Sequence, residues 1–293
     1  MTGLRWHHRP ELRDPVLVVA FEGWNDAGDA ASGAARWLAD RHEAELVATL
    51  DAEEYFDFTA TRPLIELDET GVRRLTWPDA EIWAATTDGP RDLVVLLGNE
   101  PHLRWRTFCR EVLDLADALG CSLIVTLGAL LSELPHTRPT VVSGTTEDPT
   151  LLDRLDLTRS SYEGPTGILG VLHTQARADD RPSVSLWASV PTYVSTAPSP
   201  KATLALVERS LRLLGLSVPT VDLQIASAAY ERQIDELVSA DEDTAAYVAS
   251  LEEDADADDE RHEDARLDVL SEPLEDADPG DLVEQVERFL RGD

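Results

Sequence analysis

Short, uninterrupted apolar segments restrict the fold of this chain more than any other feature of its sequence. The segments VLVVAF (16–21), DLVVLLG (92–98) and CSLIVTLG (121–128) are apolar at almost every position. Such segments are typical of strands that a parallel sheet buries on both faces. Apolar residues at helical spacing follow two of them, over residues 27–39 and 104–119. This alternation predicts an α/β domain with helices on both faces of a sheet.

The same pattern extends the sheet and adds another helix. Further strands are predicted at 44–50, 81–86, 141–146 and 183–190. A helix is predicted over 166–176, after a Gly-Pro turn. We expect a mainly parallel or mixed sheet, and no internal repeat is evident.

The character of the chain changes after about residue 198. The segment ATLALVERSLRLLG has apolar residues at helical spacing and ends in a glycine. A second helix is predicted over 221–251, and a short amphipathic helix near 281–291. We therefore divide the chain into an α/β domain, residues 1–198, and an acidic helical C-terminal subdomain, residues 199–293.

Acidic residues dominate the charge. The 293 residues include 57 acidic and 25 basic side chains, a formal net charge of −32. This argues against binding to nucleic acid or to anionic lipid, because both need clustered basic residues. Residues 231–293 alone hold 24 acidic and five basic side chains. The acidic run 252–264 is expected to be a solvated helix face or a mobile tail; the alternative is a docking tail for a basic partner.

The sequence also predicts where the protein resides. No apolar run approaches the roughly 20 residues that span a bilayer, and the first residues contain no apolar signal core. The cysteines, Cys109 and Cys121, do not have the spacing of a metal or redox motif and fit a reducing compartment. We expect a cytoplasmic protein in which both cysteines are small buried apolar residues.

A polar turn, FEGWNDAGDAAS, follows the first apolar segment and opens the first helix. It holds Glu22, Trp24, Asn25, Asp26 and Asp29 at the carboxyl end of a predicted strand, where α/β proteins place ligands. Asn25 and Asp26 are good helix N-cap types, so capping is the expected role. The alternatives are a ligand, a divalent cation held by the carboxylates, or a contact with another subunit. No phosphate-binding glycine motif is present.

Three further polar motifs lie at predicted strand ends or helix starts. GALLSELPHTRP contains His136 and Arg138, a pair suited to an anionic group. YEGPTGILG contains Glu163 and Thr166 just before a predicted helix, where Thr166 is expected to be the cap. VPTYVSTAPSPKA contains Tyr193 in an ordered connector. A stiff structural loop is the expected role of the first motif, and ligand binding is the alternative for each.

No complete catalytic set is present. G-x-S-x-G and H-E-x-x-H are both absent, so we assign no catalytic residue, metal site or cofactor. One enzymatic alternative stays open: a small-molecule hydrolase or nucleosidase with its site at the carboxyl edge of the sheet. That enzyme would use Glu22, Asn25, Asp26, His136 and Arg138.

Taken together and in this order, the four motifs resemble the PAC2 family, named after a proteasome assembly chaperone. The resemblance spans roughly residues 15–215, and the acidic C-terminus resembles the extension of actinobacterial members. It implies a three-layer α/β/α sandwich and homo-oligomers, with trimers among bacterial members. Eukaryotic and archaeal members help to assemble the proteasome α-ring. Archaeal-type members bind the proteasome through a hydrophobic-Tyr-x tail, whereas this sequence ends in FLRGD.

The resemblance implies no catalytic residues. The leading hypothesis is therefore a non-enzymatic, homo-oligomeric assembly chaperone or scaffold with a protein partner, which could be a proteasome component.

Overall fold

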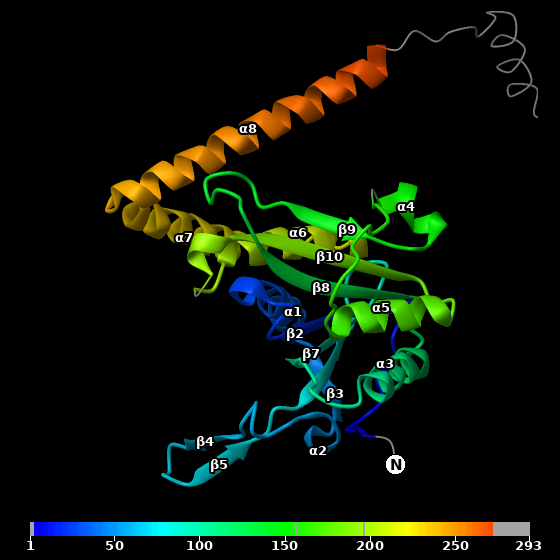
Figure 1. Ribbon diagram of the computed structural model, residues 1–293. Coiled ribbons are helices and arrows are strands. Elements are labelled where there is room, and N and C mark those ends of the chain that lie inside the picture. The colour runs from blue at the N-terminus through cyan, green and yellow to red at the C-terminus, as the bar shows by residue number, and fades with distance from the viewer. Residues whose placement is uncertain (1–2, 156, 196, 272–293) are drawn as a thin grey trace, which may run out of the picture.

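The computed structural model describes residues 3–155, 157–195 and 197–271 (Figure 1). An eight-stranded mixed sheet forms its centre. In sheet order its strands are β1 (Leu4–Trp6), β3 (Glu45–Leu50), β6 (Ala80–Ala85), β7 (Leu93–Asn99), β2 (Val16–Glu22), β8 (Leu123–Ser132), β10 (Ser183–Pro191) and β9 (Val142–Thr145). The four strands β7, β2, β8 and β10 run parallel, and the outer strands pair antiparallel.

Helices cover both faces of the sheet. On one face α1 (Ala30–Arg41) and α6 (Pro200–Leu214) pack against Val16 and Val18 of β2. On the other face α3 (Trp105–Leu119) and α5 (Ile168–Ala178) pack against Leu17 and Val19. Because successive side chains of a strand point to opposite faces, the uninterrupted apolar run of β2 serves both cores. The predicted α/β/α sandwich is confirmed.

The C-terminal helices continue from this sandwich. Helix α6 packs on α1 and β10, α7 (Val221–Ser239) packs on α6, and α8 (Glu242–Ser271) packs on α7. Figure 1 shows α8 running out beyond the body of the molecule. The domain division between residues 198 and 199 stays a prediction.

The prediction of one helix over 221–251 is wrong, because the chain starts a new helix after Asp241. The Asp241 carboxylate accepts hydrogen bonds from the backbone N–H and hydroxyl of Thr244, both at 2.7 Å. This arrangement satisfies a free amide at a helix start. The acidic run belongs to α8, which continues to Ser271. The short helix predicted at 281–291 lies outside the described residues.

A two-stranded hairpin, not predicted from the sequence, projects from the body below the sheet in Figure 1. Its strands are β4 (Leu64–Leu67) and β5 (Arg73–Thr76), and every residue of both is exposed. The carboxylate of Asp68 accepts hydrogen bonds from the backbone N–H groups of Thr70 and Val72, which fixes the turn.

The remaining short elements are α2 (Ala52–Tyr55), α4 (Pro149–Leu155) and the 3₁₀ turns η1 (Ala27–Asp29) and η2 (Thr192–Val194). Among the helices that the structure describes, none has the length and hydropathy needed to cross a bilayer.

Candidate functional site

The turn between β2 and α1 is built around Asp26. One oxygen of its carboxylate, Oδ1, accepts hydrogen bonds from the backbone N–H groups of Ala31 (2.7 Å) and Ser32 (3.2 Å). The predicted capping role of Asp26 is therefore confirmed. Gly28 and Asp29 both have left-handed backbone conformations (φ +60° and +49°), which turn the chain sharply into the helix.

Asp26 is not fully satisfied by these contacts. Asp26 is only 5% exposed. The second oxygen of its carboxylate, Oδ2, has no hydrogen-bond partner among the described residues. Burial raises the pKa of this carboxyl above its ordinary value. A buried carboxylate oxygen without a partner is unfavourable when it is charged, which is the physical cause of the raised pKa.

Asn25 joins a second cap in the same region. Its side-chain amide donates to Oε1 of Glu100 (2.8 Å), and the same oxygen accepts from the backbone N–H of Ile168 (2.9 Å) at the start of α5. Glu100 therefore caps α5, and the predicted cap, Thr166, does not. Glu100 was missed from the sequence, although its position directly after the apolar strand β7 is the signal that could have found it.

A cavity of about 1050 Å³ lies at this carboxyl edge of the sheet. The β2–α1 turn, the end of β8, the middle of β10, strand β9 and helix α5 surround it. Trp24, Asn25, Asp26 and Thr166 are among its lining residues. Trp24 is 67% exposed. Glu22 is not in this lining, and its carboxylate instead pairs with Arg36 (3.0 Å). Glu163 is exposed and also outside the lining.

Residues that the sequence did not indicate form the opposite wall of the cavity. The indole N–H of Trp187 donates to the hydroxyl of Ser185 (2.9 Å). The Trp187 ring lies directly over Gly128, where an added Cβ would come within 2.6 Å of it. On α5, His173 has a buried Nδ1 without a partner among the described residues, and burial lowers the pKa of its imidazole.

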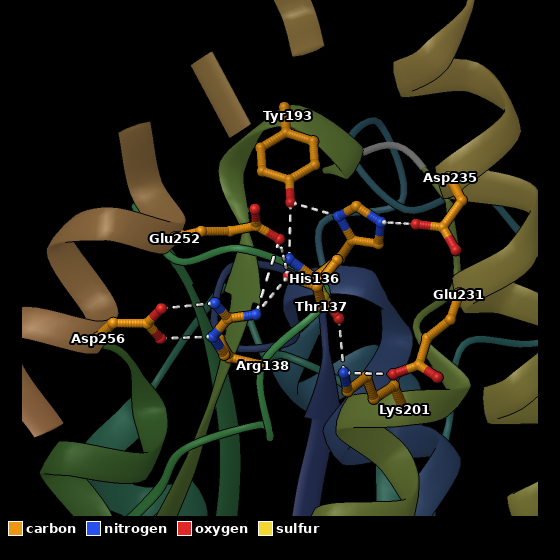
Figure 2. A network of polar contacts seen from close by, with 9 residues as sticks. All are labelled: His136, Thr137, Arg138, Tyr193, Lys201, Glu231, Asp235, Glu252 and Asp256. Atoms are coloured by element: carbon orange, nitrogen blue, oxygen red, sulfur yellow. Dashed lines mark hydrogen bonds and ion pairs between the residues drawn. The ribbon is translucent and has the colours of Figure 1, made fainter. Parts of the chain in front are cut away.

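His136 and Tyr193 meet in a separate polar network (Figure 2). The Tyr193 hydroxyl accepts from the backbone N–H of His136 (2.7 Å) and lies 2.8 Å from its Nδ1. The other ring nitrogen, Nε2, lies 3.0 Å from Asp235 on α7. Burial raises the pKa of Tyr193 to about 12, so its hydroxyl keeps its proton at neutral pH. The Tyr193 hydroxyl therefore donates to Nδ1 of His136. In that tautomer the hydrogen of the imidazole is on Nε2, which donates to Asp235.

Arg138 links the same loop to α8. Its guanidinium forms a two-point contact with Asp256 at 2.7 and 2.8 Å, and Glu252 lies 3.7 Å away. The chain's single lysine, Lys201, pairs with Glu231 and donates to the backbone oxygen of His136. Figure 2 shows these groups converging from the loop after β8, from α6 and from both C-terminal helices. The network is suited to fixing α7 and α8 on the body.

Seven of the nine predicted residues thus fall into two places, and Glu22 and Glu163 lie in neither. Trp24, Asn25, Asp26 and Thr166 line the cavity, whereas the network holds His136, Arg138 and Tyr193. Within the described ranges, no three His, Cys, Asp or Glu side chains group closely enough to hold a metal ion.

Comparison with known proteins decides the family. The model of the PAC2 family matches residues 20–238. The chain belongs to the PAC2 family. A PAC2 family protein from Streptomyces avermitilis is 47% identical, with a TM-score of 0.74 over 80% of this chain and 100% of that one. A Mycobacterium tuberculosis proteasome-assembly chaperone homologue is 44% identical, with a TM-score of 0.73 over 80% of this chain and 99% of that one.

The PAC2 fold extends to more distant structures. An archaeal proteasome activator from Pyrococcus furiosus is 17% identical, with a TM-score of 0.66 over 80% of this chain and 97% of that one. At this identity the likeness concerns the fold alone. No curated protein matches the chain.

Proposed function

We propose that this PAC2 protein is a non-enzymatic, homo-oligomeric assembly chaperone or scaffold of the cytoplasm, which forms a trimer and binds another protein. The observation that carries the proposal is the apolar face of the β4–β5 hairpin. It is a surface of the kind that protein interfaces cover, and folded monomers seldom expose one.

The hairpin places its apolar side chains together. Ile65 pairs with Leu75 in the antiparallel register, and Leu67 follows two residues along the same strand. Paired residues share a face and alternate residues return to it, so these three side chains lie on one face, together with Arg73, which pairs with Leu67 at its end. They are 60%, 48% and 68% exposed, respectively. The opposite face carries Leu64 beside charged Glu66 and its pair Arg74.

The charge of the hairpin favours a second copy of this chain as its occupant. Residues 61–77 hold three arginines and three acidic residues, so the hairpin is balanced in a chain of net charge −32. Copies of so acidic a chain repel one another over most of their surface. Contact through a neutral, apolar projection avoids that repulsion.

The relatives support a protein as the further partner. The M. tuberculosis structure, 44% identical, is described as a proteasome-assembly chaperone homologue. We accordingly propose proteasome subunits of the same organism as the partner. The acidic face of α8 as a docking site for a basic segment of that partner remains a hypothesis.

The enzymatic alternative is not favoured. It requires His136 and Arg138 to act beside Asn25 and Asp26. His136 and Arg138, however, bind side chains of the C-terminal helices. Neither lines the cavity that holds Asn25 and Asp26.

Oligomer formation is tested by light scattering after size exclusion. We expect the wild-type chain to elute as a trimer at micromolar concentration, and the double variant Ile65→Glu, Leu75→Glu to elute as a monomer. The double variant Leu64→Glu, Thr76→Glu is the matched control, because it adds the same two charges to the other face of the hairpin and should leave the trimer intact. A monomeric wild type, or equal effects of both substitutions, would refute the hairpin interface.

The protein partner is tested by co-expression with the proteasome α- and β-subunits. We expect the chain to co-purify with α-subunits and to increase the yield of assembled particles on native gels. Absence of both effects with a properly oligomeric chain would refute the chaperone role while leaving the interface intact.

A further inference from the structure

A trimer needs two different contact surfaces on each copy, and the hairpin supplies only one of them. Copies related by a three-fold axis meet head to tail, so that one surface of each copy contacts a different surface of the next. Two hairpins packed face to face would instead relate two copies by a two-fold axis and give a dimer. What we infer about the second surface therefore rests on the proposed function, of which the trimer is a part.

Large apolar side chains are also exposed around the cavity at the carboxyl edge of the sheet. Four of its lining residues are of this kind, with exposed fractions between 42% and 67%: Trp24, Leu130, Leu131 and Tyr162. Exposed apolar groups that gather in one place mark interaction sites. The volume of about 1050 Å³ lies at the top of the range of small-molecule sites, roughly 300–1,000 Å³. The cavity therefore has room for several side chains of a protein segment.

The hairpin and the cavity lie toward opposite ends of the sheet. The hairpin is inserted between β3 and β6, the second and third strands in sheet order, whereas β8, β10 and β9 at the cavity are the last three. Figure 1 shows the hairpin well away from β9 and β10. The hairpin is thus remote from the cavity of its own chain and free to enter that of a neighbour. A head-to-tail contact of this kind forms a closed ring when the rotation between copies is one third of a turn.

The charges of the two surfaces are complementary. The lining of the cavity contains the carboxylates of Asp26, Asp29 and Glu147. Its one guanidinium, that of Arg177, lies 3.5 Å from Glu147, so the lining keeps a negative charge. The apolar face of the hairpin carries the positive charge of Arg73. Asp29 and Arg73 are both exposed, and neither forms an ion pair within the described part of the chain, so each is available to a second copy.

We propose that this cavity receives the β4–β5 hairpin of a neighbouring copy, and that three such contacts close the trimer as a ring. The apolar face of the hairpin packs against the exposed Trp24, Leu130 and Tyr162 of the neighbour. Arg73 at the end of that face approaches the carboxylate of Asp29. Burial of apolar area supplies the affinity, and the opposite charges fix the orientation of the hairpin in the cavity. Each cavity is complete only in the oligomer.

Substitution of the cavity surface in the full-length chain tests its role by light scattering after size exclusion. The cavity variant Trp24→Glu, Leu130→Glu places two charges where the hairpin would pack, and we expect it to elute as a monomer. Val221→Glu, Ile225→Glu is the matched control. It changes two exposed apolar residues of α7 that lie outside the hairpin and the cavity lining, and it should leave the trimer intact. Both variants should keep the far-UV circular dichroism of the wild type.

A mixture of two variants distinguishes a head-to-tail contact from a symmetric one. The cavity variant keeps an intact hairpin, and the hairpin variant Ile65→Glu, Leu75→Glu keeps an intact cavity. The two can therefore form one contact with each other, although neither can form it with itself. We expect an equimolar mixture to contain dimers with one chain of each variant, captured by a tag on either one, while each variant alone stays monomeric. If hairpins contacted hairpins, the cavity variant alone would still form oligomers.

Photo-crosslinking locates the contact without adding a charge to either surface. A photoreactive phenylalanine analogue replaces Leu75 in the otherwise unchanged chain, and the crosslinked peptides are identified by mass spectrometry after irradiation. We expect crosslinks to peptides of a second copy that contain Trp24, Leu130 or Tyr162. The same analogue in place of Leu64, on the other face of the hairpin, is the control and should give few of these crosslinks.

A cavity variant that stays trimeric, a mixture without dimers, or crosslinks confined to the hairpin of the second copy would overturn the proposal and leave the cavity to a small molecule or another protein. These outcomes differ from failure of the proposed function. A monomeric wild type refutes the oligomer itself. A trimer that the hairpin variant breaks and the cavity variant does not leaves the hairpin interface in place and removes only the cavity as its receptor.

Discussion

Replacement of Tyr193 by phenylalanine tests whether the polar network fixes the C-terminal helices. The substitution removes one hydroxyl and leaves the ring. It deprives the backbone N–H of His136 and its Nδ1 of their partner, and His136 is only 3% exposed. Each buried polar group left without a partner costs about 1–3 kcal/mol. With two such groups, we expect Tyr193→Phe to lower the free energy of unfolding by about 2–6 kcal/mol in total.

The loss is measured from urea unfolding followed by far-UV circular dichroism at neutral pH, with hydrogen exchange to locate it. The exchange should increase first in α7, since Asp235 on that helix contacts the same imidazole. If docking of the helices depends on the network, the loss of unfolding free energy and the faster exchange in α7 will appear together.

Tyr247→Phe provides the matched control. The Tyr247 ring packs edge-on against Tyr193 with centroids 6.1 Å apart, and its hydroxyl has no hydrogen bond within the described residues. Its removal should change the unfolding free energy by less than about 0.5 kcal/mol. An equally small change for Tyr193→Phe would mean that water replaces the hydroxyl, and would refute the assigned role of the network.

Two further predictions concern α8 and the cysteines. Arg138→Ala should increase hydrogen exchange in α8 with little change in global stability, because the contact with Asp256 is largely exposed. The Arg138 guanidinium holds the pKa of Asp256 below its usual value. The contact should therefore be present at pH values above the ordinary pKa of a carboxyl group and be lost as the pH falls through the lowered pKa. Hydrogen exchange in α8 that does not depend on pH would contradict this. Cys109 is buried as predicted, whereas Cys121 is only half-buried. Burial raises the pKa of both thiols to about 12. A thiol-disulfide reagent at pH 8 should therefore label neither in the folded chain and both in urea, and rapid labelling without urea would disprove their burial.

The central part of the fold could be predicted because one physical signal determines it. Strands β2, β7 and β8 are buried on both faces, so their sequences are apolar without interruption. The β4–β5 hairpin was missed for the opposite reason. Every residue of its two strands is exposed, so neither face is buried. Its sequence therefore lacks the apolar pattern that burial imposes on a strand. The helix break at Asp241 depends on one cap with Thr244, which apolar spacing does not report.

The site was only partly predictable. Position after a buried strand was enough to place Asp26 at the cavity and to predict its cap. The partners of Asn25 and His136 come from distant segments, Glu100 and Asp235, so no local pattern could reveal them. For the same reason, the sequence could not show that FEGWNDAGDAAS lines a cavity whereas GALLSELPHTRP holds the C-terminal helices.

The sheet order has a consequence for the chain during its synthesis. Strand β2 is made early, yet Val16 pairs with Leu93 on one side and Leu123 on the other. A ribosome adding about 5–20 residues per second needs on the order of 5–20 seconds to supply both neighbours. For that interval β2, which is apolar at six of its seven positions, lacks at least one of its two neighbouring strands. This PAC2 protein therefore passes through a stage of synthesis in which an exposed apolar segment needs protection from aggregation.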